Sequence, residues 1–167
     1  LKQEGKVGEA NVFVLYDMAL DYNSNKLYAV GWRYSGQKDS KGKDTGGNKL
    51  FEVQFNGDKI EVKDVAAISG LPSGVEALTL GCTTGGQLYT ISTEAKLYKL
   101  GTEGKVQEVG TTDFVNKQNY SGANVIQSMG YDHNTNTMYW YAHSQTKSGN
   151  SYINVCETYQ VDLSNAK

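Results

Sequence analysis

The 167-residue sequence predicts an all-β protein, and three observations support this fold class. Glycine (19 residues) and tyrosine (12 residues) are abundant while proline occurs once, a composition typical of short strands and tight turns. Short runs of alternating apolar and polar residues recur along the chain, and such runs predict half-buried strands. One hairpin pattern occurs three times, at residues 17–31, 77–92 and 128–142. The sequence therefore predicts a repeated β architecture.

The first and third copies of this hairpin have nearly the same turn. DYNSN at residues 21–25 matches DHNTN at residues 132–136, whereas the middle copy has TTGG at residues 83–86. Asn and Gly accept the positive φ angles that tight hairpin turns require. After each turn a Leu-Tyr or Met-Tyr pair opens the next strand. Each copy therefore predicts the first two strands, A and B, of a larger unit.

A third strand follows each hairpin, and a fourth follows in the first two units. The third strands, C, are expected at residues 49–55, 96–100 and 158–163. The fourth strands, D, are expected at residues 60–68 and around residues 106–109. Polar turns separate C from D, which favours antiparallel pairing within each unit. The units span residues 17–70, 77–116 and 127–167, the last with strands A to C only.

The N-terminal residues are similar to the end of the second unit. LKQEGKVGEANVF at residues 1–13 matches LGTEGKVQEVGTTDF at residues 100–114. Residues 1–14 are therefore expected to form a D strand that latches a unit lacking its own. Such an arrangement removes exposed sheet edges.

The repeated pattern resembles the β-propeller repeats of secreted or cell-surface bacterial proteins, of the YVTN and NHL-like kind. The resemblance rests on the apolar-x-apolar-Asp run before the turn, the Leu/Met-Tyr pair after it, and the Leu-(Phe/Tyr)-x-apolar third strand, and it covers nearly the whole chain. It implies four-stranded blades, about three in this chain, and a secreted, periplasmic or cell-surface location.

Propellers have about 4–8 blades, so three blades predict that others complete the ring. A homodimer would give a six-bladed ring, and the latch-like offset of the N-terminal strand favours such pairing. Alternatively, the remaining blades belong to a longer chain, which the absence of an initial Met favours.

Charge and hydropathy argue against several classes of function. The net charge is −2 and the pI about 5.7, so no overall field favours nucleic acid. No apolar run of about 18 residues predicts a membrane span. Cys82 and Cys156 lie far apart without a Cys/His cluster, so zinc is not expected. Buried free thiols are the favoured state and a disulfide is the alternative.

The two Asp-Asn turns match the first half of a calcium-binding loop. Such loops place oxygen ligands at alternating positions, then need a glycine and a final bidentate glutamate, and both of these are missing here. The residues with the matching spacing are Asp21, Asn23, Asn25, Asp132, Asn134 and Asn136. The pattern is therefore interpreted as hairpin geometry, with a calcium site as the alternative, and no other metal or cofactor is expected.

The longest predicted loops carry the candidate binding residues. Inserts between strands B and C occupy residues 33–48 and 143–151, and a long D–A connection occupies residues 111–127. In a propeller these loops emerge on one face, and loops on a rigid scaffold often bind ligands. The candidates for contact with a glycan or protein ligand are Trp32, Tyr34, Tyr120, Trp140, His143 and Tyr152. For Trp140, packing between blades is the favoured alternative because it continues the apolar run MYWYA.

The sequence gives little support for catalysis. No nucleophile elbow, metalloprotease motif, phosphate loop or dinucleotide fingerprint occurs. Asp17, Glu76 and Asp113 are expected near D–A connections, where they would line a central channel, although capping of turns is favoured. We therefore expect a non-catalytic binding or interaction module. The alternatives are a fragment of a propeller-fold lyase or hydrolase acting on polysaccharide, and a structural spacer.

Overall fold

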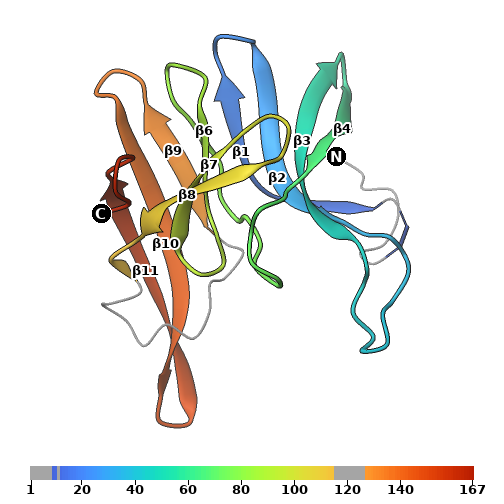
Figure 1. Cartoon of the computed structure of the whole chain (residues 1–167), viewed down its shortest axis with the longest axis vertical. Coiled ribbons are helices and arrows are strands. Elements are labelled where there is room, and N and C mark those ends of the chain that lie inside the picture. The colour runs from blue at the N-terminus through green and yellow to red at the C-terminus, as the bar shows by residue number, and fades with distance from the viewer. Residues whose placement is uncertain (1–8, 11, 115–126) are drawn as a thin grey trace.

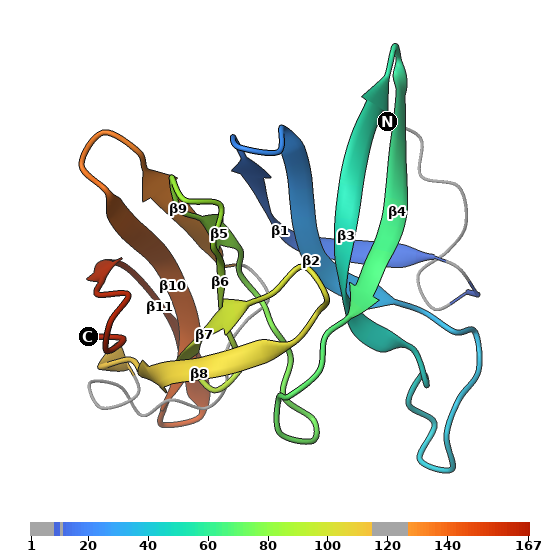
Figure 2. The same ribbon diagram turned by 45° about the horizontal axis from the view of Figure 1, so that its top comes forward.

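A computed structural model describes residues 9–10, 12–114 and 127–167, with only the backbone described at residues 144–148, 152 and 155 (Figures 1 and 2). Within these residues, eleven β-strands form three antiparallel sheets of four, four and three strands. The expected all-β class is confirmed. No helix in the same residues is long and apolar enough to cross a membrane.

The strands follow one another in sequence order within each sheet. Sheet 1 contains β1 (Phe13–Asp21), β2 (Lys26–Arg33), β3 (Gly47–Asn56) and β4 (Lys59–Ala67). Sheet 2 contains β5 (Gly81–Cys82), β6 (Leu88–Ile91), β7 (Lys96–Leu100) and β8 (Val106–Thr111). Sheet 3 contains β9 (Ser128–Asp132), β10 (Thr137–Ser148) and β11 (Ser151–Val161). This order follows from short connections between neighbouring antiparallel strands.

The three sheets share one register between their second and third strands. The equivalent pairs are Leu27–Val53, Leu88–Leu100 and Met138–Val161. Because side chains alternate across a strand, each sheet has two faces. The shared register makes each face of one sheet equivalent to one face of each of the other sheets. We call the face that carries Tyr28, Tyr89 or Tyr139 the forward face. The opposite face, with Leu27, Leu88 or Met138, is the backward face.

The forward faces of sheets 1 and 2 pack on the backward faces of sheets 2 and 3, respectively, so sheet 2 lies between the other two (Figure 1). The core between sheets 1 and 2 includes Tyr28, Val30, Leu50, Leu88, Tyr98 and Leu100. The core between sheets 2 and 3 includes Tyr89, Ile91, Leu97, Met138, Trp140 and Val161. Each such side chain contributes roughly 1.5–3 kcal/mol by leaving water. A third cluster, with Ala29, Phe51 and Val53, lies on the backward face of sheet 1.

The sheets have two distinct ends. The turns at residues 22–25, 83–87 and 133–136 lie at the top of Figure 1, and we call this the turn end. Loop 34–46 and the connection 68–80 lie at the bottom, and we call this the loop end. In the first unit, the B–C loop and the D–A connection therefore lie at the same end of the sheet.

The expected B–C insert at residues 143–151 was wrong. β10 and β11 continue as a hairpin, paired from Met138–Val161 to Ser148–Ser151. The turn comes only at Gly149, whose φ of 61° suits glycine. The sequence did not predict this extension because residues 143–148 (HSQTKS) contain no apolar residue, so no alternation of apolar and polar residues marks this part of the strand.

Part of the expected N-terminal D strand belongs to another element. Phe13 and Val14 lie in β1 and pair with Arg33 and Trp32 of β2. Residues 1–8 lie outside the described residues, so a latching strand there stays a prediction. The described part of sheet 3 has no fourth strand.

Both cysteines are free, as expected, but only Cys82 is buried. The expectation of a buried thiol was wrong for Cys156, which is exposed on β11. Burial raises the pKa of Cys82 to about 11, with a smaller contribution from Asp21. The two thiols therefore differ in reactivity, because the thiolate is the reactive form.

Candidate functional site

The inner strands of the three sheets meet at the carboxylate of Asp17. Its Oδ2 accepts hydrogen bonds from the backbone N–H groups of Leu80 and Met129, both at 2.8 Å. Its Oδ1 accepts from the backbone N–H of Met18 and the hydroxyl of Ser128, both at 3.0 Å. By the shared register, Met18, Leu80 and Met129 are equivalent positions. The same N–H group of each sheet therefore donates to one carboxylate.

These four donors give Asp17 a structural role. Burial raises the pKa of Asp17, although the hydrogen bonds from Leu80 and Met129 oppose the rise. A shared channel was the alternative to turn capping for Asp17, Glu76 and Asp113, and the structure places these carboxylates in three different contacts. Glu76 accepts a hydrogen bond from the Tyr16 hydroxyl at 3.1 Å, and Asp113 forms an ion pair with Lys167 at 2.8 Å.

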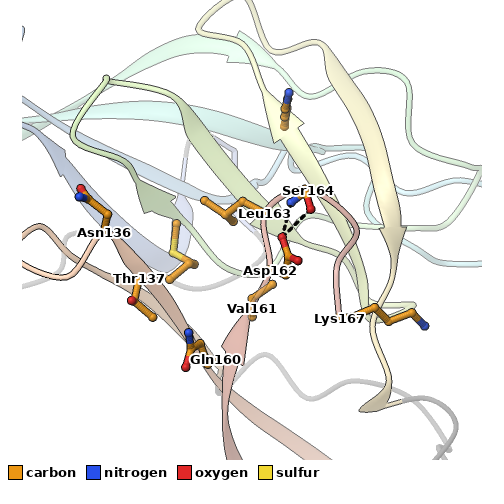
Figure 3. Close-up of a pocket in the computed structure, with 10 residues that line it drawn as sticks. Asn136, Thr137, Gln160, Val161, Asp162, Leu163, Ser164 and Lys167 are labelled. Carbon is orange, nitrogen blue, oxygen red and sulfur yellow. Dashed lines mark hydrogen bonds between the residues drawn. The ribbon is translucent and has the colours of Figure 1, made fainter.

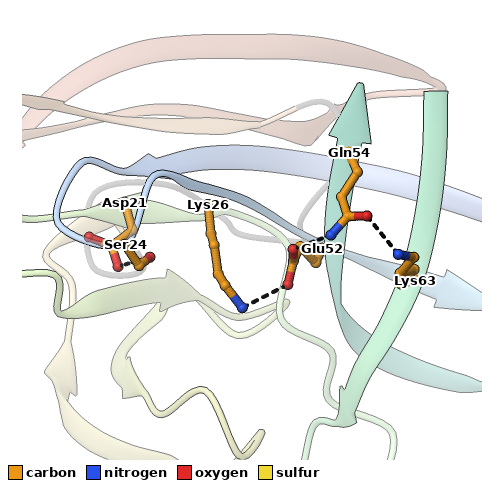
Figure 4. Close-up of polar contacts among 6 residues, drawn as sticks. All are labelled: Asp21, Ser24, Lys26, Glu52, Gln54 and Lys63. Carbon is orange, nitrogen blue, oxygen red and sulfur yellow. Dashed lines mark hydrogen bonds and ion pairs between the residues drawn. The ribbon is translucent and has the colours of Figure 1, made fainter. Parts of the chain in front are cut away.

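At the turn end, the carboxylates of Asp21 and Asp132 stabilise their own turns. Each accepts a backbone N–H from the residue two positions later, at 3.0 and 2.9 Å, and a hydroxyl from the residue three positions later, at 2.6 and 2.7 Å. Figure 4 shows the hydroxyl contact between Ser24 and Asp21. Asn25 and Asn136 both have a φ of 53°, as tight turns require. No group of three or more His, Cys, Asp or Glu side chains in the described residues is placed to hold a metal ion.

The loop end of sheet 1 contains a pocket of about 260 Å³. Loop 34–46 and its flanking strands form one side, and the connection 68–80 forms the other. The side chains that matter for chemistry are Trp32, Lys43, Asn48, Leu71, Pro72 and Glu76. Two segments far apart in sequence therefore form one concave site, the usual shape of a small-ligand site.

Asn48 fastens the two sides of this pocket together. Its Nδ2 donates to the carbonyl oxygens of Gly31 at 3.0 Å and Ala77 at 3.2 Å. Its Oδ1 accepts from the backbone N–H of Ala77 at 2.8 Å. The Asn48 side chain is thus fully engaged within the protein and positions the pocket walls.

Loop 34–46 is organised by Asp44. Its carboxylate accepts hydrogen bonds from the backbone N–H groups of Ser35, Gly36 and Gly46, at 3.0, 3.1 and 2.7 Å. Desolvation opposes ionisation, but these donors hold the pKa of Asp44 below its ordinary value. The carboxylate therefore stays charged at neutral pH and keeps its donors, which fixes the loop that carries Lys43.

The groups that line the pocket combine an aromatic face with two opposite charges. The Lys43 Nζ lies 5.7 Å from the centroid of the half-buried Trp32 ring. Burial, followed by the Glu76 carboxylate, raises the pKa of Tyr16, so the Tyr16 hydroxyl keeps its proton and donates to Glu76. An aromatic ring can pack on the apolar face of a sugar while the ammonium and carboxylate bind its hydroxyls.

The structure does not bring the six sequence-predicted candidates together. Trp32 lines the pocket, and Tyr34 begins loop 34–46 without lining it. Trp140 is buried between sheets 2 and 3 and donates its Nε1–H to Gln127 at 2.9 Å, as its packing alternative predicted. His143 is buried in β10. Tyr120 lies outside the described residues, as does the side chain of Tyr152.

Sequence reasoning missed Lys43, Asn48 and the wall at Leu71 and Pro72. The one signal that pointed to this wall was the single proline of the chain, which lies in the connection after the first unit. Glu76 was noted only as a channel residue. Nothing in the sequence linked Glu76 to Trp32, because their proximity depends on the packing of sheet 1 against sheet 2.

A second hollow, of about 860 Å³, lies between β7 and the C-terminal segment (Figure 3). Its lining includes Lys99, Asn136, Gln160 and Lys167, and no aromatic side chain. Asp162 accepts the backbone N–H and the hydroxyl of Ser164 at 2.8 and 2.7 Å, which shapes the C-terminal turn. Without an aromatic face, this hollow is less suited to a neutral ligand than the pocket at Trp32.

No protein-family model matches this chain. A search of curated proteins finds no match either, so the site is interpreted from its own geometry.

Proposed function

We propose that the chain is a non-catalytic binding module and that the pocket beside Trp32 binds a glycan. One observation carries this proposal: the Trp32 ring, the Lys43 ammonium and the Glu76 carboxylate line the same 260 Å³ pocket. The pocket is held by Asn48 and Asp44, so its walls are formed before a ligand arrives. Such preorganisation lowers the entropy lost on binding.

The proposal includes a propeller-type scaffold. It is supported by the shared strand order, the shared register and the forward-on-backward packing of the three sheets. Completion of a ring, by a second copy or by further blades, belongs to the same proposal. A secreted, periplasmic or cell-surface location rests on the resemblance of the repeats.

The polysaccharide-degrading alternative has less support. A retaining mechanism needs two carboxyl groups about 5–5.5 Å apart, both free to act on substrate. Glu76 is the one carboxylate among the described residues that line the pocket, and Asp17 lies elsewhere, where it accepts hydrogen bonds from Leu80 and Met129. The spacer alternative does not explain why a half-buried tryptophan lines a pocket.

A glycan array tests the proposal with the chain and two matched variants. Trp32→Ala removes the aromatic face, and Tyr22→Ala removes an aromatic side chain at the turn end that is 66% exposed. We expect Trp32→Ala to weaken binding of any captured glycan by about 10–100-fold, because a buried aromatic contact contributes roughly 1.5–3 kcal/mol. Tyr22→Ala should leave binding unchanged.

Two outcomes contradict the proposal. If the chain captures no glycan at millimolar concentration, the proposed glycan binding is wrong. If a captured glycan binds Trp32→Ala as tightly as it binds the unaltered chain, the binding site is not the pocket beside Trp32.

A further inference from the structure

The forward face is covered in sheets 1 and 2 and uncovered in sheet 3. Tyr28 and Tyr89 are 6% and 7% exposed, because the next sheet packs on each of them. Tyr139, at the equivalent position of sheet 3, is 42% exposed. Within the described residues, this tyrosine therefore packs against the next sheet in sheets 1 and 2 and has no such packing partner in sheet 3.

The neighbouring positions of this face follow the same rule. Val30 and Ile91 are fully buried, whereas Tyr141 at the equivalent position is 40% exposed. On the third strands, Leu97 is buried, whereas Thr158 at the equivalent position is exposed. Cys156, which pairs with His143 on the same face, is exposed as well. The open area extends from Tyr139 to Cys156 and ends near His143, which is buried.

Two equivalent glycines indicate what this face receives. A Cβ added at Gly81 would lie 2.5 Å from the Met138 Sδ and 2.7 Å from its Cε, so Gly81 leaves room for the next sheet's methionine. Gly130 is the equivalent position of sheet 3, paired with Tyr139 as Gly81 is paired with Tyr89. A Cβ at Gly130 would have no other described heavy atom within 4 Å. The space that Met138 fills beside Gly81 is thus empty beside Gly130.

We propose that the forward face of sheet 3 docks a further four-stranded sheet of this same repeat, carried outside residues 1–167. That sheet places the Leu or Met of its Leu/Met-Tyr pair beside Gly130 and packs its second and third strands on Tyr139 and Tyr141. The inference rests on the propeller scaffold of the proposed function and is independent of the glycan pocket.

A second copy of the chain is a poorer occupant of this face. The backward face it would offer is that of sheet 1, where Ala29 and Phe51 are fully buried and Val53 is 6% exposed within their own chain. The exposed part of this face, from Tyr139 to Cys156, carries tyrosine, threonine, glutamine and cysteine side chains, and the charged Asp132 lies only at its turn end. A sheet with a free backward face of the same repeat fits both observations.

An extended chain tests the proposal. Residues 101–167 are joined after Val161, the position equivalent to Leu100, with Cys156→Ser in the added copy. The addition provides a fourth strand for sheet 3 and a further sheet whose backward face carries Met138 and Trp140. The readout is the reaction of the Cys156 thiol with Ellman's reagent, since Cys82 is buried.

In the chain without the extension, Cys156 should react rapidly. In the extended chain we expect its reaction to slow by about tenfold or more, because the added sheet covers it. Gly130→Leu in the first copy should restore rapid reaction by filling the space that the incoming methionine needs. An unchanged rate in the extended chain overturns the proposal.

A second measurement does not depend on the folding of the extended chain. In the chain alone, Tyr28→Ser should lower the melting temperature by roughly 5–10 °C, and Tyr139→Ser should leave it within about 1 °C, because only Tyr28 has a packed partner. Equal losses would show that the face is already covered and overturn the proposal. A dimer in sedimentation with a slowly reacting Cys156 would also overturn it, in favour of a second copy.

Discussion

The two ends of sheet 1 use polar side chains in different ways. At the turn end, Glu52 accepts hydrogen bonds from Lys26 at 3.1 Å and Gln54 at 2.5 Å, and Lys63 donates to Gln54 at 2.6 Å (Figure 4). These groups bind one another along the strands. At the loop end, hydrogen bonds to Asn48 and Asp44 fix the backbone around the pocket, and the Trp32 side chain lines that pocket. Polar side chains indicate a binding site only where their hydrogen-bonding groups are not all taken up by other groups of the protein.

The largest expected effect is at Asp17, whose carboxylate joins the inner strands of the three sheets. Asp17→Ala leaves the part-buried backbone N–H groups of Leu80 and Met129 without their acceptor, so we expect unfolding free energy to fall by about 3–5 kcal/mol. Urea denaturation measures this loss. Asp113→Ala, which removes an exposed ion pair, should cost less than about 1 kcal/mol. A loss at Asp17 no larger than at Asp113 would contradict the role of Asp17 as the link between the sheets.

A smaller effect separates the two ends directly. Asn48→Ala removes three hydrogen bonds at the loop end, so we expect a loss of about 2–3 kcal/mol and weaker glycan binding. Asn23→Ala removes one hydrogen bond at the turn end, from its Nδ2 to the Thr84 carbonyl at 2.8 Å. It should cost about 1 kcal/mol and leave binding unchanged. Calorimetry on both variants checks stability and affinity together, and weaker binding in Asn23→Ala would contradict the assignment of function to the loop end.

The smallest expected effect is on the pH dependence of stability. Glu52 at the turn end and Asp44 at the loop end change it in the same direction. A hydrogen bond from Gln54, then one from Lys26, lowers the pKa of Glu52, and backbone donors lower that of Asp44 against desolvation. A folded pKa below the unfolded value gives stability above the unfolded pKa, and that stability is lost as pH falls through the folded pKa.

Asp17 acts in the opposite direction on acidification. Its folded pKa is raised by burial above the ordinary value of 3.8, so protonation between the two values favours the folded state. As pH falls from neutral toward 3.8, stability should therefore fall more steeply in Asp17→Asn than in the unaltered chain. Urea denaturation across this range measures the slopes, and equal slopes would contradict a raised Asp17 pKa.

The sequence predicted local features of the fold well. Strand alternation and the Asn-rich turns depend on neighbouring residues, and Asn25 and Asn136 have the positive φ that those turns require. It did not predict the contacts of Asp17, because its donors lie 63 and 112 positions away. Exposure of Cys156 was also unpredictable, because β11 follows the repeat pattern and only the position of sheet 3 in the array leaves its forward face open.

The most direct test of a functional loop end is hydrogen exchange of the chain with and without a glycan captured on the array. We predict slower exchange in loop 34–46 and the connection 68–80, because the ligand lies between them. Exchange in the turns at residues 22–25 and 133–136 should not change. Protection confined to those turns, with none in loop 34–46, would contradict the account.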